Sequence, residues 1–195
     1  PHKDYDLNPW ADKRFPFGTQ GGDFTAKNIR NTLDGLEFFV GPNRYKINIF
    51  GRFNVYNALT AIIVGSVFEI SPGIIAQGLK NLKLIPGRME KIDEGQNFLV
   101  FVDYAHEKEG MNAVLDTVKD LVSEKKGLPA GKAGKVIVLL GAEGGGRDKS
   151  KRPELGEIAA KKADFVVISN VDPYEDNPKE ILEDIARAAE NFGKK

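Results

Sequence analysis

Three short apolar runs in the second half of the chain limit the folds available to it: FLVFV at 98–102, VIVLL at 136–140 and FVVIS at 165–169. Segments with helical spacing of apolar residues separate these runs, which predicts alternating strands and helices. A parallel sheet is the economical arrangement for such an alternation, because each helix returns the chain to the same end of the sheet. We therefore expect an α/β fold built on a parallel sheet.

Polar or glycine-rich residues follow each run directly. Asp103 and His106 follow the first run, Gly144 to Asp148 the second, and Asn170 to Asp176 the third. The carboxyl ends of parallel strands lie along one edge of the sheet, where open α/β sheets bind their ligands. The sequence thus predicts one functional site along this edge.

The first half of the chain has a different pattern. FTAKNI, LEFFV and YKINIF are short β-rich runs separated by turn signals, which predicts a small antiparallel sheet before residue 52. Helices are expected at 53–70 and 72–82. Ser71 and Pro72 would supply the N-cap and first-turn proline of the second helix.

The segment LKLIPGRMEKIDEGQ interrupts the helical pattern with Pro86 and two glycines, and we take it as a joint between domains. The expected domains are 1–86 and 87–195. Beyond the joint, a helix is expected at 107–124, and Asn177 followed by a proline marks the start of a last helix.

Charge and composition narrow the possible partners. The chain has 195 residues, and its 28 basic residues balance 28 acidic ones, so no overall field attracts nucleic acid. The apolar runs are far shorter than the ~20 residues of a membrane span, and cysteine is absent, which fits a cytoplasmic protein. We expect a small-molecule partner. The chain starts with proline rather than methionine, so we also expect it to be a piece of a longer protein.

The most unusual segment is GAEGGGRDKSKRP at 141–153, where glycines precede Arg147, Lys149, Lys151 and Arg152. Glycines let backbone amides approach an anion, and cations beside a helix N-terminus favour negative charge. An anionic ligand is the expected occupant. The segment is neither a Walker A motif nor GxGxxG, so no nucleotide is specified, and a mobile surface loop is the alternative.

Other polar residues at the expected edge allow two interpretations each. Asp103 could accept hydrogen bonds from a ribose and His106 could contact phosphate or carry a proton, or the pair could cap and pack the next helix. Asn54 and Asn57 share one face at the start of the long helix, where carboxamides either form a cap or bind an adenine edge. Arg88 could reach a phosphate or pair with Glu90 or Asp93.

Taken in order, these motifs resemble the Mur ligases: GRFNVYNALTA, PGRME, VDYAH, a glycine loop running into RDKSKRPELGEIA, and an acid-rich DP turn. The resemblance is strongest to the branch that adds the third amino acid to UDP-N-acetylmuramoyl dipeptide. It implies the end of a P-loop-type central ATP-binding domain, followed by a truncated Rossmann-like parallel-sheet domain. It also implies that ATP and Mg²⁺ serve the reaction, with the P-loop and the metal ligands before Pro1, so this chain alone is expected to be inactive.

The resemblance assigns the site residues as follows. Asn54 and Asn57 match adenine contacts; Arg88, Asp103 and Tyr104 match contacts to the phosphate and ribose region; His106 completes the DYAH motif of the same cleft. Arg147 matches the arginine that approaches the carboxylate of the incoming amino acid, with Asn170, Asp172 and Tyr174 beside it. The implied partners are the UDP-muramoyl dipeptide and a diamino acid.

The chain departs from the diaminopimelate-adding branch at 171–174, where VDPY replaces DNPR and Tyr174 replaces an arginine. A phenol donates one hydrogen bond and cannot form the bidentate, charge-assisted pair of a guanidinium with a carboxylate. Lysine and a differently recognised diaminopimelate therefore both remain candidates.

Three other classes remain open from the sequence. The first is another enzyme of the superfamily, such as a folylpolyglutamate synthetase or a lipid-II-modifying relative. The second is a noncatalytic nucleotide-binding module. The third is an α/β interaction domain with a mobile glycine loop.

Overall fold

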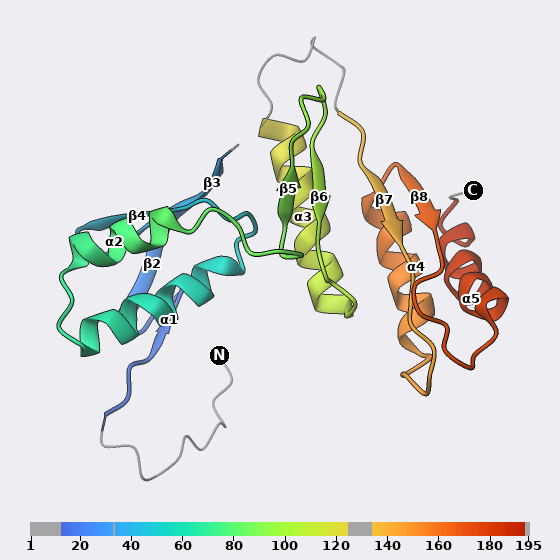
Figure 1. Ribbon diagram of the computed structural model, residues 1–195, viewed down its shortest axis with the longest axis horizontal. Coiled ribbons are helices and arrows are strands. Elements are labelled where there is room, and N and C mark those ends of the chain that lie inside the picture. The colour runs from blue at the N-terminus through green and yellow to red at the C-terminus, as the bar shows by residue number, and fades with distance from the viewer. Residues whose placement is uncertain (1–12, 33, 125–133, 194–195) are drawn as a thin grey trace.

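The computed structural model describes residues 13–32, 34–124 and 134–193 (Figure 1). In chain order its elements are β1 (Phe17–Gly18), β2 (Phe24–Thr32), β3 (Gly35–Val40), β4 (Asn43–Ile47), α1 (Asn54–Val67), α2 (Pro72–Asn81), β5 (Glu90–Ile92), β6 (Val100–Val102), α3 (Lys108–Glu124), β7 (Ile137–Leu140), α4 (Lys151–Lys162), β8 (Phe165–Ile168) and α5 (Pro178–Glu190).

The expected antiparallel sheet is present in the first half. β2, β3 and β4 pair antiparallel in that order, and β1 adds a short parallel edge. Alternate residues of β3, including Leu36 and Phe38, are fully buried against α1 and α2. Gly35 has a φ of +127° and lies so close to β4 that an added Cβ would sit 2.1 Å from the Ile47 oxygen. The turn between β2 and β3 therefore requires glycine.

Helices α1 and α2 lie beside this sheet (Figure 1). In the same core α1 buries Val55, Leu59 and Ile62, and α2 buries Ile75. Both occur where the periodicity predicts them, although α1 ends three residues early, at Val67 rather than 70. Pro72 occupies the first turn of α2 as expected. Ser71 is the N-cap residue as predicted, although its side chain makes no capping hydrogen bond.

The first of the three apolar runs does not join a parallel sheet. β6 pairs antiparallel with β5, with Glu90 opposite Val102 and Ile92 opposite Val100. Gly95, with a φ of +84°, lies in the short connection between the two strands. Closing this local hairpin costs less chain entropy than pairing β6 across α3 with β7. The prediction of a three-stranded parallel sheet is therefore wrong for residues 98–102.

The other two runs pair as predicted. β7 and β8 run parallel in register from Ile137 opposite Phe165 to Leu140 opposite Ile168. Their inner face shares a core with α3, α4 and α5. Figure 1 shows α4 behind this sheet and α5 beside it. This arrangement is the strand–helix–strand unit that the alternating pattern indicated, and it carries the 141–150 loop at the carboxyl end of β7.

A third cluster connects the two halves of the chain. Phe50, Met89 and Leu121 are buried together, and the ring of Phe101 on β6 meets the ring of Phe50 edge-on at 5.0 Å. Beside this cluster, Asn31 Nδ2 donates to Asp120 Oδ2 at 3.3 Å. These contacts place the joint segment against α3.

The last helix begins as its sequence predicts. Asn177 Oδ1 accepts a hydrogen bond from the Lys179 amide at 3.0 Å, and Pro178 stands in the first turn.

No helix in the part of the chain that the structure describes is both long and apolar enough to cross a membrane.

Candidate functional site

The two asparagines at the start of α1 bond to each other. Asn54 is buried, and its Nδ2 donates to the Phe50 oxygen at 2.7 Å. Asn57 is exposed, and its Nδ2 donates to Asn54 Oδ1 at 2.9 Å. Asn54 thus holds the chain entering the helix and orients the carboxamide of Asn57 at the surface. Neither side chain caps a helix amide, because the N-cap residue of α1 is Phe53 and no side-chain capping bond forms there, so the capping alternative is wrong.

Asp103 holds two backbone segments together just after β6. Its Oδ2 accepts from the Met89 amide at 2.7 Å, and its Oδ1 accepts from the Ala105 amide at 2.8 Å. Because Met89 belongs to the PGRME segment, this carboxylate fixes that segment beside the DYAH motif. Neither bond is a cap on α3, so the capping alternative for Asp103 is wrong.

Arg88, Tyr104 and His106 form an exposed row over this junction. The Arg88 guanidinium lies 5.0 Å from the centre of the Tyr104 ring, and the His106 ring meets the same ring edge-on at 5.1 Å. His106 Nδ1 lies 3.0 Å from the backbone carbonyl oxygen of Tyr104. The expected acid partners of Arg88 bond elsewhere: Glu90 accepts from the Gly87 amide and Asp93 pairs with Lys91. The guanidinium therefore remains available to an anion.

Glu107 connects this row to the glycine loop. Its Oε1 lies 3.6 Å from His106 Nε2 and forms a close ion pair with Lys151 at the start of α4. Hydrogen bonding to Glu107 raises the pKa of Lys151. A second ion pair, Lys108 with Glu154 at 3.0 Å, joins α3 to α4. Glu107 was not among the predicted site residues; its position directly after the DYAH motif is the signal that could have identified it.

The glycine loop lies directly against the turn that follows β8. The Gly144 amide donates to the backbone carbonyl oxygen of Asp172 at 2.9 Å. A Cβ on Gly144 would lie 2.0 Å from the Pro173 oxygen, and one on Gly141 would lie 2.2 Å from the Ser169 oxygen. Two of the glycines are thus required for backbone packing between the segments 141–146 and 169–176, which we call the loop–turn seam.

Arg147 and Tyr174 meet on the surface of the seam. The Arg147 guanidinium lies 5.7 Å from the centre of the Tyr174 ring, and its Nε pairs with Glu143 Oε2 at 3.0 Å. A Cβ on Gly145 would lie 2.8 Å from the Tyr174 ring. The side chains of Asn170 and Asp172 are exposed beside them. The structure therefore brings Arg147 and Tyr174 into contact, and Asn170 and Asp172 lie in the same turn segment as Tyr174.

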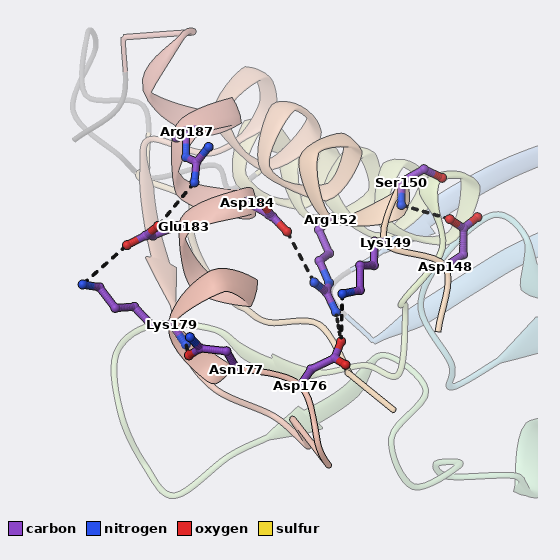
Figure 2. Close-up of polar contacts among 10 residues, drawn as sticks. All are labelled: Asp148, Lys149, Ser150, Arg152, Asp176, Asn177, Lys179, Glu183, Asp184 and Arg187. Carbon is purple, nitrogen blue, oxygen red and sulfur yellow. Dashed lines mark hydrogen bonds and ion pairs between the residues drawn. The ribbon is translucent and has the colours of Figure 1, made fainter. Parts of the chain in front are cut away.

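The cations of the glycine loop do not form an open anion cradle. Lys149 lies 3.7 Å from Asp176, and Arg152 bonds the same carboxylate (Figure 2). The start of α4 already has an acid of its own, because Asp148 Oδ1 accepts from the Ser150 amide at 2.9 Å. Hydrogen bonds from Ser150 lower the pKa of Asp148. The expectation of an anion at this helix start is therefore not supported.

The pKa of Asp176 is lowered as well, chiefly by its hydrogen bond from Arg152, with Lys149 adding to the effect and Asp184 on α5 sharing the guanidinium. A depressed folded-state pKa contributes stability that is present above the unfolded pKa, near 3.8, and is lost as the pH falls through the folded value. We expect the stability difference between the wild type and Asp176→Asn to be constant above about pH 5 and to shrink below about pH 4. Urea denaturation of the full-length proteins from pH 7 to pH 2.5 measures it; a difference that does not change with pH would contradict this assignment.

Clusters of metal-ligating side chains are absent from the described residues. Across residues 13–32, 34–124 and 134–193, no group of three or more histidine, aspartate and glutamate side chains could hold a metal ion. One hollow between α4 and α5 is lined by Lys149 of the glycine loop, and another lies between α3 and α4.

The predicted residues thus lie in three groups: the two asparagines at the start of α1, the joint with the DYAH motif, and the loop–turn seam. The ion pair of Glu107 with Lys151 connects the DYAH motif to the start of α4, next to the seam. The family described as "Mur ligase, glutamate ligase domain" matches residues 87–194, which is more than half of the chain. The chain belongs to the Mur ligase family, as its motifs predict.

The relatives and solved structures agree with this placement. A UDP-N-acetylmuramoyl-L-alanyl-D-glutamate–2,6-diaminopimelate ligase of Syntrophomonas wolfei is 38% identical over 191 residues, which cover 91% of this chain and 37% of that ligase. The chain thus spans little more than a third of the length of this relative. The UDP-N-acetylmuramate-alanine ligase of Thermotoga maritima aligns over 93% of this chain and 38% of its own, with a TM-score of 0.72 at 20% identity. A Mycobacterium tuberculosis folylpolyglutamate synthase aligns over 88% of this chain and 36% of its own, with a TM-score of 0.60 at 19% identity. At these identities the two structures show a shared fold.

Proposed function

We propose that this chain is part of an ATP-dependent ligase of peptidoglycan precursor synthesis. The enzyme would join a diamino acid, as the third residue, to UDP-N-acetylmuramoyl-L-alanyl-D-glutamate. The observation that carries this proposal is the 38% identity to a diaminopimelate ligase over 91% of the chain. The contact of Arg147 with Tyr174 at the loop–turn seam supports it.

We propose two domains for the chain. Residues 1–86 would be the end of the central ATP-binding domain, and residues 87–195 the start of the Rossmann-like domain. The core that α1 and α2 share with the antiparallel sheet, and the separate core of the parallel sheet, support this division. The activity belongs to the whole protein, because the chain spans 37% of its relative. On its own this chain would be inactive.

The proposed reaction is amide formation through an acyl phosphate. ATP supplies the phosphoryl group that activates the acceptor carboxylate, and the amine of the diamino acid then displaces phosphate. Asn57, oriented by Asn54, would bind the adenine. Arg88, with Tyr104 beneath it, would contact the phosphates, and Asp103 the ribose.

His106 and Arg147 would act nearest to the reacting groups. His106 is exposed, with Nε2 directed towards Glu107, so it could contact a phosphate or carry a proton. Arg147 would bind the carboxylate of the incoming amino acid, and Asn170, Asp172 and Tyr174 would border the same site. Holding both reactants in one orientation is the main contribution of such residues to the rate.

Two features of the chain bear on which diamino acid the enzyme would join. The name of the relative supports diaminopimelate, whereas Tyr174 supplies a phenol in place of the guanidinium expected for its distal carboxylate. The test is an assay of the full-length protein with ATP, UDP-muramoyl dipeptide and a panel of amino acids. We expect ADP release that depends on diaminopimelate or lysine. Use of a folate acceptor instead would assign the protein to the folylpolyglutamate synthetases, and ATP binding without turnover would make it a noncatalytic module.

Asn57→Ala in the full-length protein is expected to raise the KM for ATP about tenfold while leaving the KM for the amino acid within about twofold, because a carboxamide–adenine pair contributes about 1–3 kcal/mol. Steady-state kinetics with each substrate varied in turn measures the effect. Gln77→Ala is the matched control, since it removes an exposed carboxamide that bonds within α2, to Asn81. An unchanged KM for ATP in Asn57→Ala would exclude the adenine role.

A further inference from the structure

Arg152 is the largest fully buried side chain among the described residues, with 2% of its surface exposed. It stands in the first turn of α4, immediately after the glycine loop. A cation at a helix N-terminus is opposed by the helix dipole, and a buried charge loses its hydration. Neither the helix nor the core explains why an arginine stands at this position, so the explanation must lie in its partners.

Those partners come from two other segments. Arg152 Nη2 donates to Asp176 Oδ2 at 2.7 Å, and Nη1 donates to Asp184 Oδ2 at 3.3 Å (Figure 2). Asp176 ends the turn after β8, and Asp184 lies on α5. The buried Nε of Arg152 has no hydrogen-bond partner among the described residues. One guanidinium therefore ties the start of α4 to the turn and to α5, and the turn has the shorter of the two bonds.

The turn that Arg152 holds is the one that carries Tyr174. The Asp176 amide donates to the Pro173 oxygen at 3.0 Å, which closes the turn around Tyr174. Tyr174 has a φ of +49°, a conformation that is costly for a tyrosine and persists only where its surroundings enforce it. The Cβ of Asp176 packs against Gly144, 2.8 Å from where a Cβ on that glycine would lie. Asp176 is thus the point at which Arg152 can act on both sides of the seam.

We propose that Arg152 is a positioning residue that, through Asp176, holds the Tyr174 turn against the glycine loop and thereby sets the site for the incoming amino acid. This inference rests on the proposed function for its effect on catalysis. Its structural part stands on the contacts alone. Arg152 reaches neither Arg147 nor Tyr174 directly, so it acts only through the geometry of the seam.

The two carboxylates provide a matched pair of variants in the full-length protein. Asp176→Asn loosens the turn, and we expect the KM for the amino acid to rise at least tenfold, with the KM for ATP within twofold. Asp184→Asn removes only the negative charge that Arg152 meets on α5 and leaves the shorter bond to the turn, so the amino-acid KM is expected to stay within twofold. Arg152→Met should match Asp176→Asn. Arg152→Lys keeps the positive charge but lacks the planar fork that reaches both carboxylates. Its amino-acid KM should therefore lie between the values of the wild type and Arg152→Met.

Amide hydrogen exchange provides a readout that needs no activity. The Gly144 amide, which donates across the seam to the Asp172 oxygen, is expected to exchange at least tenfold faster in Arg152→Met and Asp176→Asn. In Asp184→Asn its rate should change less than threefold. The Ser169 amide, which donates to the Leu140 oxygen, reports opening of the sheet and should change little in any of these variants.

The outcomes separate the two proposals. Equal increases in the amino-acid KM for Asp176→Asn and Asp184→Asn, or an unchanged Gly144 exchange rate in Arg152→Met, would overturn the positioning role. If the wild-type protein joins no diamino acid to the dipeptide, the proposed function fails, and the exchange rates still decide whether Arg152 holds the seam.

Discussion

Replacing Gly144 with alanine is expected to open the loop–turn seam. The new Cβ would lie 2.0 Å from the Pro173 oxygen and 2.8 Å from the Asp176 Cβ, and neither atom is the end of a flexible side chain. Forcing a methyl group into such a contact costs about 3 kcal/mol, the upper end of the usual range for overpacking. The hydrogen bond from the Gly144 amide to the Asp172 oxygen would be lost with it. Urea denaturation of the full-length protein measures the loss of stability.

The effect on the proposed reaction should be larger than the effect on stability suggests. A displacement of about 1 Å in a positioning segment can cost about 10²-fold in rate, so kcat/KM for the amino acid is expected to fall about a hundredfold in Gly144→Ala. Gly146→Ala is the control in the same loop: Gly146 has a φ of +78° but open space around it, so the backbone strain costs about 1 kcal/mol and the seam stays closed. Equal losses in the two variants would show that backbone strain, and not the seam, decides the outcome.

Arg147→Ala in the full-length protein is expected to raise the KM for the incoming amino acid about 10- to 100-fold, and the KM for ATP much less. A charge-assisted hydrogen bond between a guanidinium and a carboxylate contributes about 1.5–3 kcal/mol, and each 1.4 kcal/mol corresponds to about tenfold. The Tyr174 ring and Glu143 hold the guanidinium in place without burying it. Steady-state kinetics with the amino acid varied at saturating ATP gives the measurement.

Arg187→Ala is the matched control for this variant. Arg187 is also exposed and also pairs with an acid four residues before it, Glu183, at 3.3 Å, but it lies on α5 outside the seam. Its replacement should leave both KM values unchanged. If Arg147→Ala behaves in the same way as Arg187→Ala, the arginine does not bind the amino acid.

Local sequence signals predicted the helices well. The Asn177 cap and the proline after it fix the start of α5 within one residue, because both act on the neighbouring backbone. The same holds for α2 with its first-turn Pro72. The antiparallel sheet and the β7–β8 pair followed from apolar patterns that are equally local. These elements needed no knowledge of the rest of the fold.

The sequence predicted contacts between distant segments less well. The apolar run at 98–102 reads as a strand, but nothing in it specifies β5 rather than β7 as its partner. The glycines at 141–146 read as an anion cradle, whereas Gly141 and Gly144 are needed for backbone packing against the turn. Arg152 reads as one more cation of a surface loop, and only the fold reveals that it is buried between two carboxylates.

The proposed site residues serve one reaction, in which a carboxylate is activated by phosphate and then joined to an amine. The most direct measurement uses the full-length protein and UDP-muramoyl dipeptide whose acceptor carboxylate is labelled with ¹⁸O. Attack by that carboxylate on ATP, followed by displacement by the amine, transfers one labelled oxygen to each phosphate released. We predict singly labelled phosphate in amounts equal to the amide formed. Unlabelled phosphate, or phosphate released without amide formation, would contradict the account.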